Sequence, residues 1–141
     1  MNECVFCRIV RGELKSFVVY EDEDTLAFLD IYPISKGHTL VIPKSHFENI
    51  FDIDYDVLKK VITTVRKVSL AMRKLGAEGV NVILNNGKAA EQHVFHIHFH
   101  VIPRYNNDGL NMDILARRIK YDSMEEMRET AIKINRVISL I

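Results

Sequence analysis

The 141-residue sequence lacks an excess of either charge, because 19 Lys and Arg side chains are matched by 19 Asp and Glu. General nucleic-acid and membrane-surface binders show a basic excess or stripe, so we expect no nucleic acid and no membrane among the partners. No apolar run approaches the ~20 residues needed to span a bilayer. The first residues also lack the basic and then apolar stretch of a secretory signal. We therefore expect a cytoplasmic protein.

Cysteine is scarce as well, since Cys4 and Cys7 are the two cysteines of the sequence and form one C-x-x-C. In a reducing compartment such a pair indicates a metal or redox site rather than a structural disulfide. A thioredoxin-like redox motif follows a strand inside a βαβ unit, and no strand is predicted before Cys4. The pattern therefore favours a metal site.

Long linkers and repeats are absent too, and the three prolines and six glycines are scattered. Residues 1–141 are therefore predicted to form one domain. Alternation and turn residues predict five strands, and three- and four-residue apolar spacing predicts a long helix. A capping box at Ser123 and Glu126 begins a final helix. Because strands and helices do not alternate, the fold class is α+β with a mostly antiparallel sheet. The predicted elements are strands Phe17–Tyr20, Thr25–Asp30, His38–Ile42, Gly79–Leu84 and Val94–Ile102, and the long helix Tyr55–Leu75.

Three histidines, His96, His98 and His100, alternate with apolar residues near the end of the last predicted strand. Side chains alternate between the faces of a strand, so the three imidazoles share one face and the apolar residues can sit on a core. Chance clustering, a metal site and phosphoryl or nucleotidyl transfer are the possible explanations. A catalytic metal on the triad would make the protein an H-x-H-x-H metalloenzyme. Spacing alone does not separate the metal site from the transfer chemistry.

The motif His96-Ile97-His98-Phe99-His100-Val101-Ile102 resembles the histidine-triad (HIT) signature H-φ-H-φ-H-φ-φ, with φ apolar, at every position. Further segments resemble the same family, and together the likeness covers residues 4–104. It implies a HIT-like fold, with a five-stranded mostly antiparallel sheet, one long helix and a C-terminal helix. The further segments are Leu26–Ile31, Gly37–His46, Asn85–Gly87 and Pro103–Arg104.

The resemblance implies a nucleotide hydrolase that acts on phosphoramidates or related adenylyl conjugates. His98 is the implied nucleophile, which forms a covalent nucleotidyl-histidine at the α-phosphorus. His100 contacts the phosphate and the departing or entering group, and His96 orients the constellation. Dinucleoside polyphosphate hydrolysis, as in the Fhit branch, is the first alternative. A nucleotide-binding or adaptor protein with vestigial activity is the second.

The same resemblance implies a nucleotide site, with a purine nucleotide as substrate. Asn85, Gln92 and His93 correspond to phosphate-side positions, and Asp30 to the residue that accepts the ribose hydroxyls. Two positions depart from the family pattern: Glu91 replaces a small residue, commonly glycine, and His93 replaces Ser or Thr. The expected base slot consists of Phe6, Ile9, Leu14, Phe28 and Ile31.

A structural zinc ion and a homodimer are also implied. Cys4, Cys7, His46 and His96 offer two thiolates and two imidazoles, which suit tetrahedral zinc with no open position. The chemistry itself requires no cofactor. The long helix has more apolar surface than one face of a small sheet needs, and similar members dimerise through this helix and an adjoining strand. Residues 105–141 resemble nothing specific, and the C-terminal Trp-Gly of the Hint branch is absent because the sequence has no tryptophan.

Overall fold

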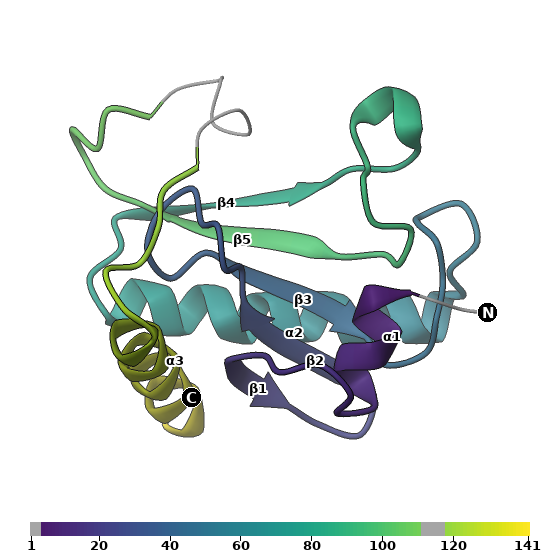
Figure 1. Cartoon of the computed structure of the whole chain (residues 1–141), viewed down its shortest axis with the longest axis horizontal. Coiled ribbons are helices and arrows are strands. Elements are labelled where there is room, and N and C mark those ends of the chain that lie inside the picture. Colours follow the sequence, from purple (N-terminus) through teal and green to yellow (C-terminus); the bar gives the residue numbers. More distant parts are fainter. Residues whose placement is uncertain (1–3, 111–117) are drawn as a thin grey trace.

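A computed structural model describes residues 4–110 and 118–141 and shows one five-stranded sheet in the order β1-β2-β3-β5-β4 (Figure 1). All four neighbouring pairs are antiparallel. The predicted α+β class and five-stranded, mostly antiparallel sheet are therefore confirmed. The strands are β1 Val18–Glu21, β2 Thr25–Leu29, β3 Thr39–Pro43, β4 Gly79–Leu84 and β5 Phe99–Arg104.

The helices begin where the sequence provides capping side chains. In α2, Tyr55–Lys74, the Asp54 side chain accepts from the Val57 amide at the first turn. In α3, Met124–Ser139, Ser123 accepts from the Glu126 amide as predicted. The Glu126 carboxylate, however, reaches back to the Asp122 amide. The short elements are α1, Val5–Val10, and the 3-10 turn η1, Lys88–Ala90. No helix within the described ranges is long and apolar enough to cross a membrane.

Helices cover both faces of the sheet (Figure 1). On one face, α2 and α3 pack on the alternate strand residues Ala27, Leu29, Val41, Phe99 and Val101 in the main hydrophobic core. On the other face, α1 contributes Phe6 to a smaller cluster with Leu26, Phe28, Leu40 and Ile42. The candidate site lies on this second face, in a cavity lined by residues of α1, β2 and β3.

The last strand begins later than the prediction Val94–Ile102. Its ladder with β3 starts at the pair Val41–Phe99, and its ladder with β4 starts at Leu84–Phe99. β4 ends at Leu84, opposite Phe99, and β3 beyond Val41 pairs with β2 alone, so the described chain before Phe99 forms no regular ladder. The chain is instead held by a bond from the Ile97 amide to the Phe47 carbonyl.

Candidate active site

A cavity of about 470 Å³ lies beside α1 and contains two histidines of the triad, His98 and His100. This volume is within the range of small-molecule sites. The structure brings nearly all the predicted nucleotide residues to its wall, whereas Gln92 and His96 do not line it. The predicted residues that line it are Phe6, Ile9, Leu14, Phe28, Asp30, Ile31, Asn85, His93, His98 and His100.

Gln92 supports the loop rather than facing the cavity. It is 2% exposed, and its carbonyl oxygen accepts from the Gly87 amide and from Asn49 Nδ2. Its amide nitrogen donates to the Glu48 and Val94 carbonyls. Because a side-chain amide offers two donors and one accepting oxygen, little of it is left for a ligand.

The predicted common face of the three histidines is present although His96 and His98 precede β5. The Phe6 ring from α1 lies edge-on to the rings of both His96 and His98. Ile97 between them points into the main core. The segment is therefore extended enough to keep a period of two without belonging to a ladder.

His98 is held in one tautomer by the main chain. Its Nδ1 atom lies 2.8 Å from the His96 carbonyl oxygen. A carbonyl can only accept, so Nδ1 carries the proton and Nε2 keeps a free lone pair. Burial lowers the pKa of His98 below its ordinary 6.5. The residue is therefore a neutral imidazole at pH 7 with an available nucleophilic nitrogen.

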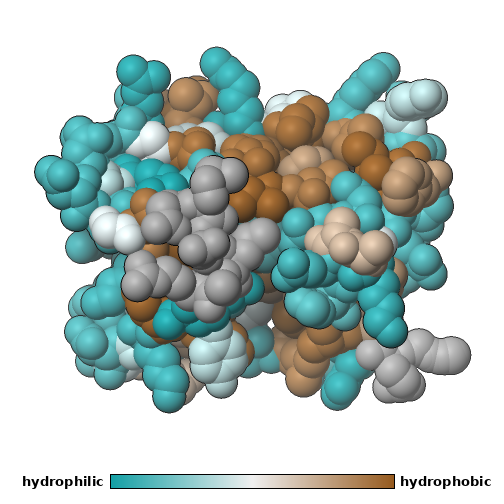
Figure 2. Space-filling view, turned by 90° about the horizontal axis from the view of Figure 1, so that it is seen from above, coloured by the Kyte–Doolittle hydropathy of each residue, from teal (hydrophilic) through white to brown (hydrophobic). Residues whose placement is uncertain are grey.

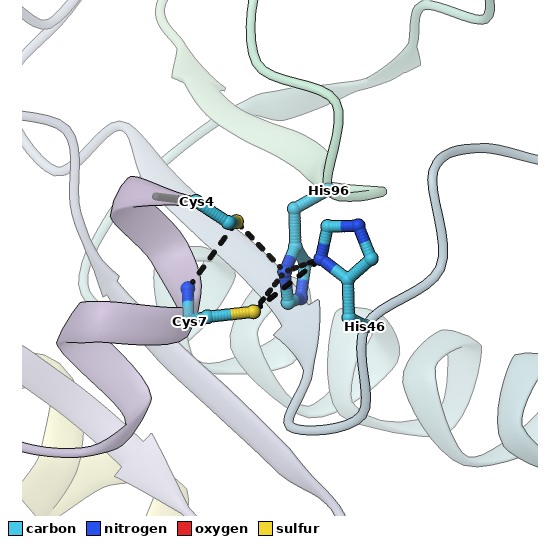
Figure 3. A group of neighbouring side chains, drawn as sticks. All are labelled: Cys4, Cys7, His46 and His96. Atoms are coloured by element: carbon cyan, nitrogen blue, oxygen red, sulfur yellow. Dashed lines mark hydrogen bonds between the residues drawn. The ribbon is translucent and has the colours of Figure 1, made fainter. Parts of the chain in front are cut away.

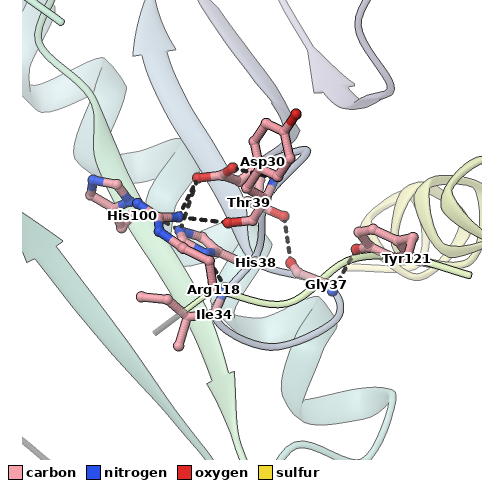
Figure 4. A network of polar contacts seen from close by, with 9 residues as sticks. Asp30, Ile34, Gly37, His38, Thr39, His100, Arg118 and Tyr121 are labelled. Carbon is pink, nitrogen blue, oxygen red and sulfur yellow. Dashed lines mark hydrogen bonds and ion pairs between the residues drawn. The ribbon is translucent and has the colours of Figure 1, made fainter. Parts of the chain in front are cut away.

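His100 is held in the opposite tautomer by His38 (Figure 4). The Ile34 amide donates to His38 Nδ1 at 3.0 Å, so the proton of neutral His38 is on Nε2. That nitrogen lies 3.0 Å from His100 Nδ1, which must accept. His100 therefore carries its proton on Nε2. Burial is the main cause that lowers the pKa of both His38 and His100 to about 3.

Asp30 joins this network from the end of β2 (Figure 4). Its Oδ1 accepts from the Tyr32 amide at 2.8 Å, and its Oδ2 accepts from Arg118 Nη1 at 3.0 Å. His38 Nε2 lies 3.7 Å from the same Oδ2. Asp30, His38 and His100 are close enough to resemble a metal site. Arg118, however, already provides the positive charge beside the carboxylate.

Arg118 lines the cavity and was not predicted from the sequence. It lies 88 positions from Asp30 in the chain, in the stretch 105–141 that offers no motif. Neither periodicity nor spacing marks an isolated arginine as a partner of so distant a carboxylate. Residues 111–117 of this stretch are outside the described residues.

Cys4, Cys7, His46 and His96 point toward one another beside the start of α1 (Figure 3). Sγ of Cys4 is 3.4 Å from Nδ1 of His96, and Sγ of Cys7 is 3.3 Å from Nδ1 of His46. The two Nδ1 atoms are 3.2 Å apart. Tetrahedral zinc, with bonds of about 2.0–2.3 Å, separates its ligands by roughly 3.3–3.8 Å. All four donor atoms lie within 4.8 Å of one another, and the distances given are close to this range, so the residues suit a tetrahedral zinc ion.

The main chain fixes the orientation of His96. Its Nε2 lies 2.8 Å from the Pro43 carbonyl oxygen, so Nε2 carries the proton and Nδ1 presents a lone pair to the two sulfur atoms. A hydrogen bond from the far nitrogen is the usual way in which a ligating histidine is fixed.

Glu91 adopts the left-handed conformation, with φ 67°, on the wall of the cavity. A side chain at such a φ is strained, whereas glycine is not. This backbone geometry gives a physical reason for the small residue that the family pattern carries here. Lys15 is a further cation on the cavity wall, so the charged groups there are of both signs.

Comparisons with known proteins agree with this architecture. The HIT domain model matches residues 11–107. An uncharacterized HIT-like protein of Methanocaldococcus jannaschii is 52% identical over 106 residues, which are 75% of this chain and 82% of that protein. An adenosine 5′-monophosphoramidase of Candida albicans is 36% identical over 132 residues, 89% of this chain and 87% of that enzyme. The crystal structure of a zinc-bound histidine triad family protein from Mycobacterium smegmatis gives a TM-score of 0.87 at 37% identity, covering 98% of this chain and 94% of that one.

The five-stranded sheet, the histidine triad and these relatives place the chain in the HIT domain family. The resemblance inferred from the motif is thereby confirmed.

Proposed function

We propose that the protein is a nucleotide hydrolase that cleaves at the α-phosphorus of nucleoside phosphoramidates or related adenylyl conjugates. The observation that carries the proposal is the pair of opposite tautomers in one cavity. His98 offers a lone pair on Nε2, and His100 offers a proton on Nε2. Attack on phosphorus needs the first, and stabilisation of phosphoryl oxygens needs a donor such as the second.

The reaction has two steps. In the first, Nε2 of His98 forms a bond to phosphorus while the bond from phosphorus to the leaving nitrogen breaks, and the amine departs with a proton taken from solvent. In the second, water adds to phosphorus, the bond to His98 breaks and a proton returns to solvent. The product is a nucleoside monophosphate. The His100 Nε2–H donates to a phosphoryl oxygen in both steps.

The cavity wall provides the rest of the nucleotide site. Phe6, Ile9, Leu14, Phe28 and Ile31 form its apolar part, which suits the flat face of a purine. We assign Asp30, which lines the cavity, to accept from the ribose hydroxyls, and Asn85 and His93 to donate to the phosphate. The Candida albicans relative, named an adenosine 5′-monophosphoramidase, supports the same substrate class.

We further propose that Cys4, Cys7, His46 and His96 hold a structural zinc ion. Four protein ligands leave no open coordination position, so the ion supplies a cross-link between α1 and the chain before β5, not chemistry. The zinc-bound relative supports this assignment.

A homodimer is proposed through α2 and β4. β4 is an edge strand of the sheet, and Val82 on β4 and Ile62 on α2 are 44% and 46% exposed. Figure 2 shows hydrophobic residues gathered on the face of the molecule at which this edge lies. Dimerisation would cover the unpaired edge. Light scattering at micromolar concentration should give twice the chain mass, and a monomer would refute this arrangement.

The test of the hydrolase compares wild type with His98→Ala on an adenosine phosphoramidate and a diadenosine polyphosphate, with AMP binding measured by calorimetry. We expect the phosphoramidate to react faster. The variant should lose turnover by a factor of about 10³ or more and still bind AMP. Full activity in His98→Ala would refute the mechanism. A faster diadenosine reaction would indicate dinucleoside polyphosphate hydrolysis, and AMP binding without turnover would indicate a binding protein.

A further inference from the structure

We propose that Arg118 is a positioning residue for ribose recognition, which it serves by holding the Asp30 carboxylate toward the 2′- and 3′-hydroxyls of the bound nucleotide. This inference rests on the proposed function, since the ribose belongs to the nucleotide substrate. It assigns part of the nucleotide site to the segment after residue 117, which carries no recognisable motif.

Arg118 is fixed on the loop that connects β2 to β3 (Figure 4). Its Nη1 atom donates both to Asp30 Oδ2, at 3.0 Å, and to the Tyr32 carbonyl, at 2.8 Å. The next residue continues the attachment, because the Ile119 amide donates to the Pro33 carbonyl at 2.8 Å. The guanidinium is therefore fixed to the backbone beside Asp30, and its bond to the carboxylate holds that carboxylate in place.

Tyr121 attaches the same segment at the far end of the loop. Its hydroxyl accepts from the Gly37 amide at 2.8 Å, and Lys36 pairs with Glu126 at the start of α3. The loop that these two attachments hold, residues 30–38 between β2 and β3, carries both Asp30 and His38. The segment that contains Arg118 thus holds the loop at both ends.

The acceptor sites of Asp30 match what a ribose requires. A carboxylate has about four lone-pair sites, two on each oxygen. The Tyr32 amide uses one on Oδ1, and Arg118 uses one on Oδ2. Counting only the described part of the chain, one site remains on each oxygen, which suits two neighbouring hydroxyls. The Asp30 side chain is 14% exposed and lines the cavity, so a ligand can reach these sites.

The charge of Arg118 also suits a cavity that must admit a phosphate. Asp30 and Glu91 both line the wall, and two unpaired carboxylates would repel an anionic ligand. Among the described residues, Arg118 is the sole side chain that donates to Asp30. Its pairing with Asp30 offsets one of these charges.

The experiment measures AMP, 2′-deoxyAMP and 3′-deoxyAMP binding by calorimetry. It compares wild type with Arg118→Ala, Arg118→Lys and Asp30→Asn, and each variant is checked by thermal melting. Arg128→Ala is the matched control, because Arg128 is an exposed arginine of α3 whose side chain makes no hydrogen bond or ion pair with any described residue. Hydrogen bonds to a charged group predict that wild type prefers AMP over either deoxynucleotide by about tenfold. In Arg118→Ala and Asp30→Asn the preference should fall to about twofold or less.

Arg118→Lys should keep part of the preference, since a lysine retains the charge but not the paired geometry. Arg128→Ala should behave like wild type. Equal weakening of all three ligands in Arg118→Ala, with the preference intact, would overturn the inference and leave Arg118 a structural residue. Tighter AMP binding in that variant would overturn it too, since Arg118 would then occupy the ribose position. A wild type that does not bind AMP would overturn the hydrolase proposal as well.

Discussion

His38 Nε2 lies 3.0 Å from His100 Nδ1, and the ring of His100 in turn lies 5.1 Å from that of His98. The first distance, together with the bond from the Ile34 amide to His38, determines which nitrogen of His100 carries the proton. The neighbouring His98 takes its tautomer from a carbonyl and so carries its proton on the other nitrogen. The two adjacent imidazoles thereby have different chemical roles, because the Nδ1 atom of His98 bonds a carbonyl and the Nδ1 atom of His100 bonds His38.

Replacement of His38 should lower turnover without removing the nucleotide site. In His38→Asn the partner that keeps His100 in its donor tautomer is lost, and kcat should fall about ten- to a hundredfold. Thr39→Val is a matched control, because Thr39 is buried beside His38 but bonds the Gly37 carbonyl. Steady-state kinetics together with AMP binding make the measurement. An equal loss of kcat in both variants would show that general disturbance of the strand is responsible.

Acidification should destabilise the fold between about pH 6.5 and pH 5. The pKa values of His38 and His100 are lowered to about 3 in the folded chain, whereas an unfolded histidine titrates near 6.5. Below pH 6.5 the unfolded state therefore binds more protons than the folded state. The free energy of unfolding then decreases, as the pH is lowered, by roughly 1.4 kcal/mol per histidine per pH unit. Above about pH 7.5 neither group contributes.

Urea unfolding from pH 7.5 to pH 5 measures this slope. His100→Asn, compared with wild type, should reduce the slope by the contribution of about one bound proton, roughly 1.4 kcal/mol per pH unit. An unchanged slope in the variant would contradict the assignment of His100 as a buried neutral group.

Zinc removal should destabilise the protein. Metal present at about a hundred times its dissociation constant contributes about 2.7 kcal/mol, which corresponds to a melting shift of roughly 5–10 °C for a chain of this size. Cys4→Ser should melt lower and no longer respond to added zinc. His100→Asn, which leaves all four ligands intact, should respond like wild type, and metal analysis should find about one zinc per chain. Wild type that contains no metal and melts unchanged on zinc addition would refute the site.

Glu91 should weaken phosphate binding through its charge and strain the loop through its backbone. Glu91→Gln removes the charge alone, and AMP should bind about twofold tighter at low salt, with the gain lost at high salt. Glu91→Gly also removes the strain of the left-handed conformation, which should raise the free energy of unfolding by roughly 1–2 kcal/mol. Glycine makes the unfolded chain freer, which offsets about 0.5–1 kcal/mol of this gain. Calorimetry and urea unfolding separate the two effects. A glutamine variant that binds no better, at low salt, would place the carboxylate away from the phosphate.

Local patterns predicted the elements well where the chain is governed by its own periodicity. The bounds of β4 agree with the prediction Gly79–Leu84, and α2 ends within one residue of Leu75. The predicted start of β5 was wrong because a strand requires partners: β4 ends opposite Phe99, and β3 beyond Val41 pairs with β2 alone. Residues 94–98 by themselves do not indicate where pairing with the two neighbouring strands stops.

The sequence by itself determined the common face of His96, His98 and His100 and the apolar face behind them, because a period of two is a property of any extended chain. The resemblance to the family predicted most of the residues that line the cavity, from Phe6 to His93. Tertiary structure alone decided the tautomers, the inward use of Gln92 and the pairing of Asp30 with Arg118. Each of these depends on a hydrogen bond between distant segments or on a single carbonyl or amide. Such bonds produce no periodic pattern in the sequence, so they could not be predicted from it.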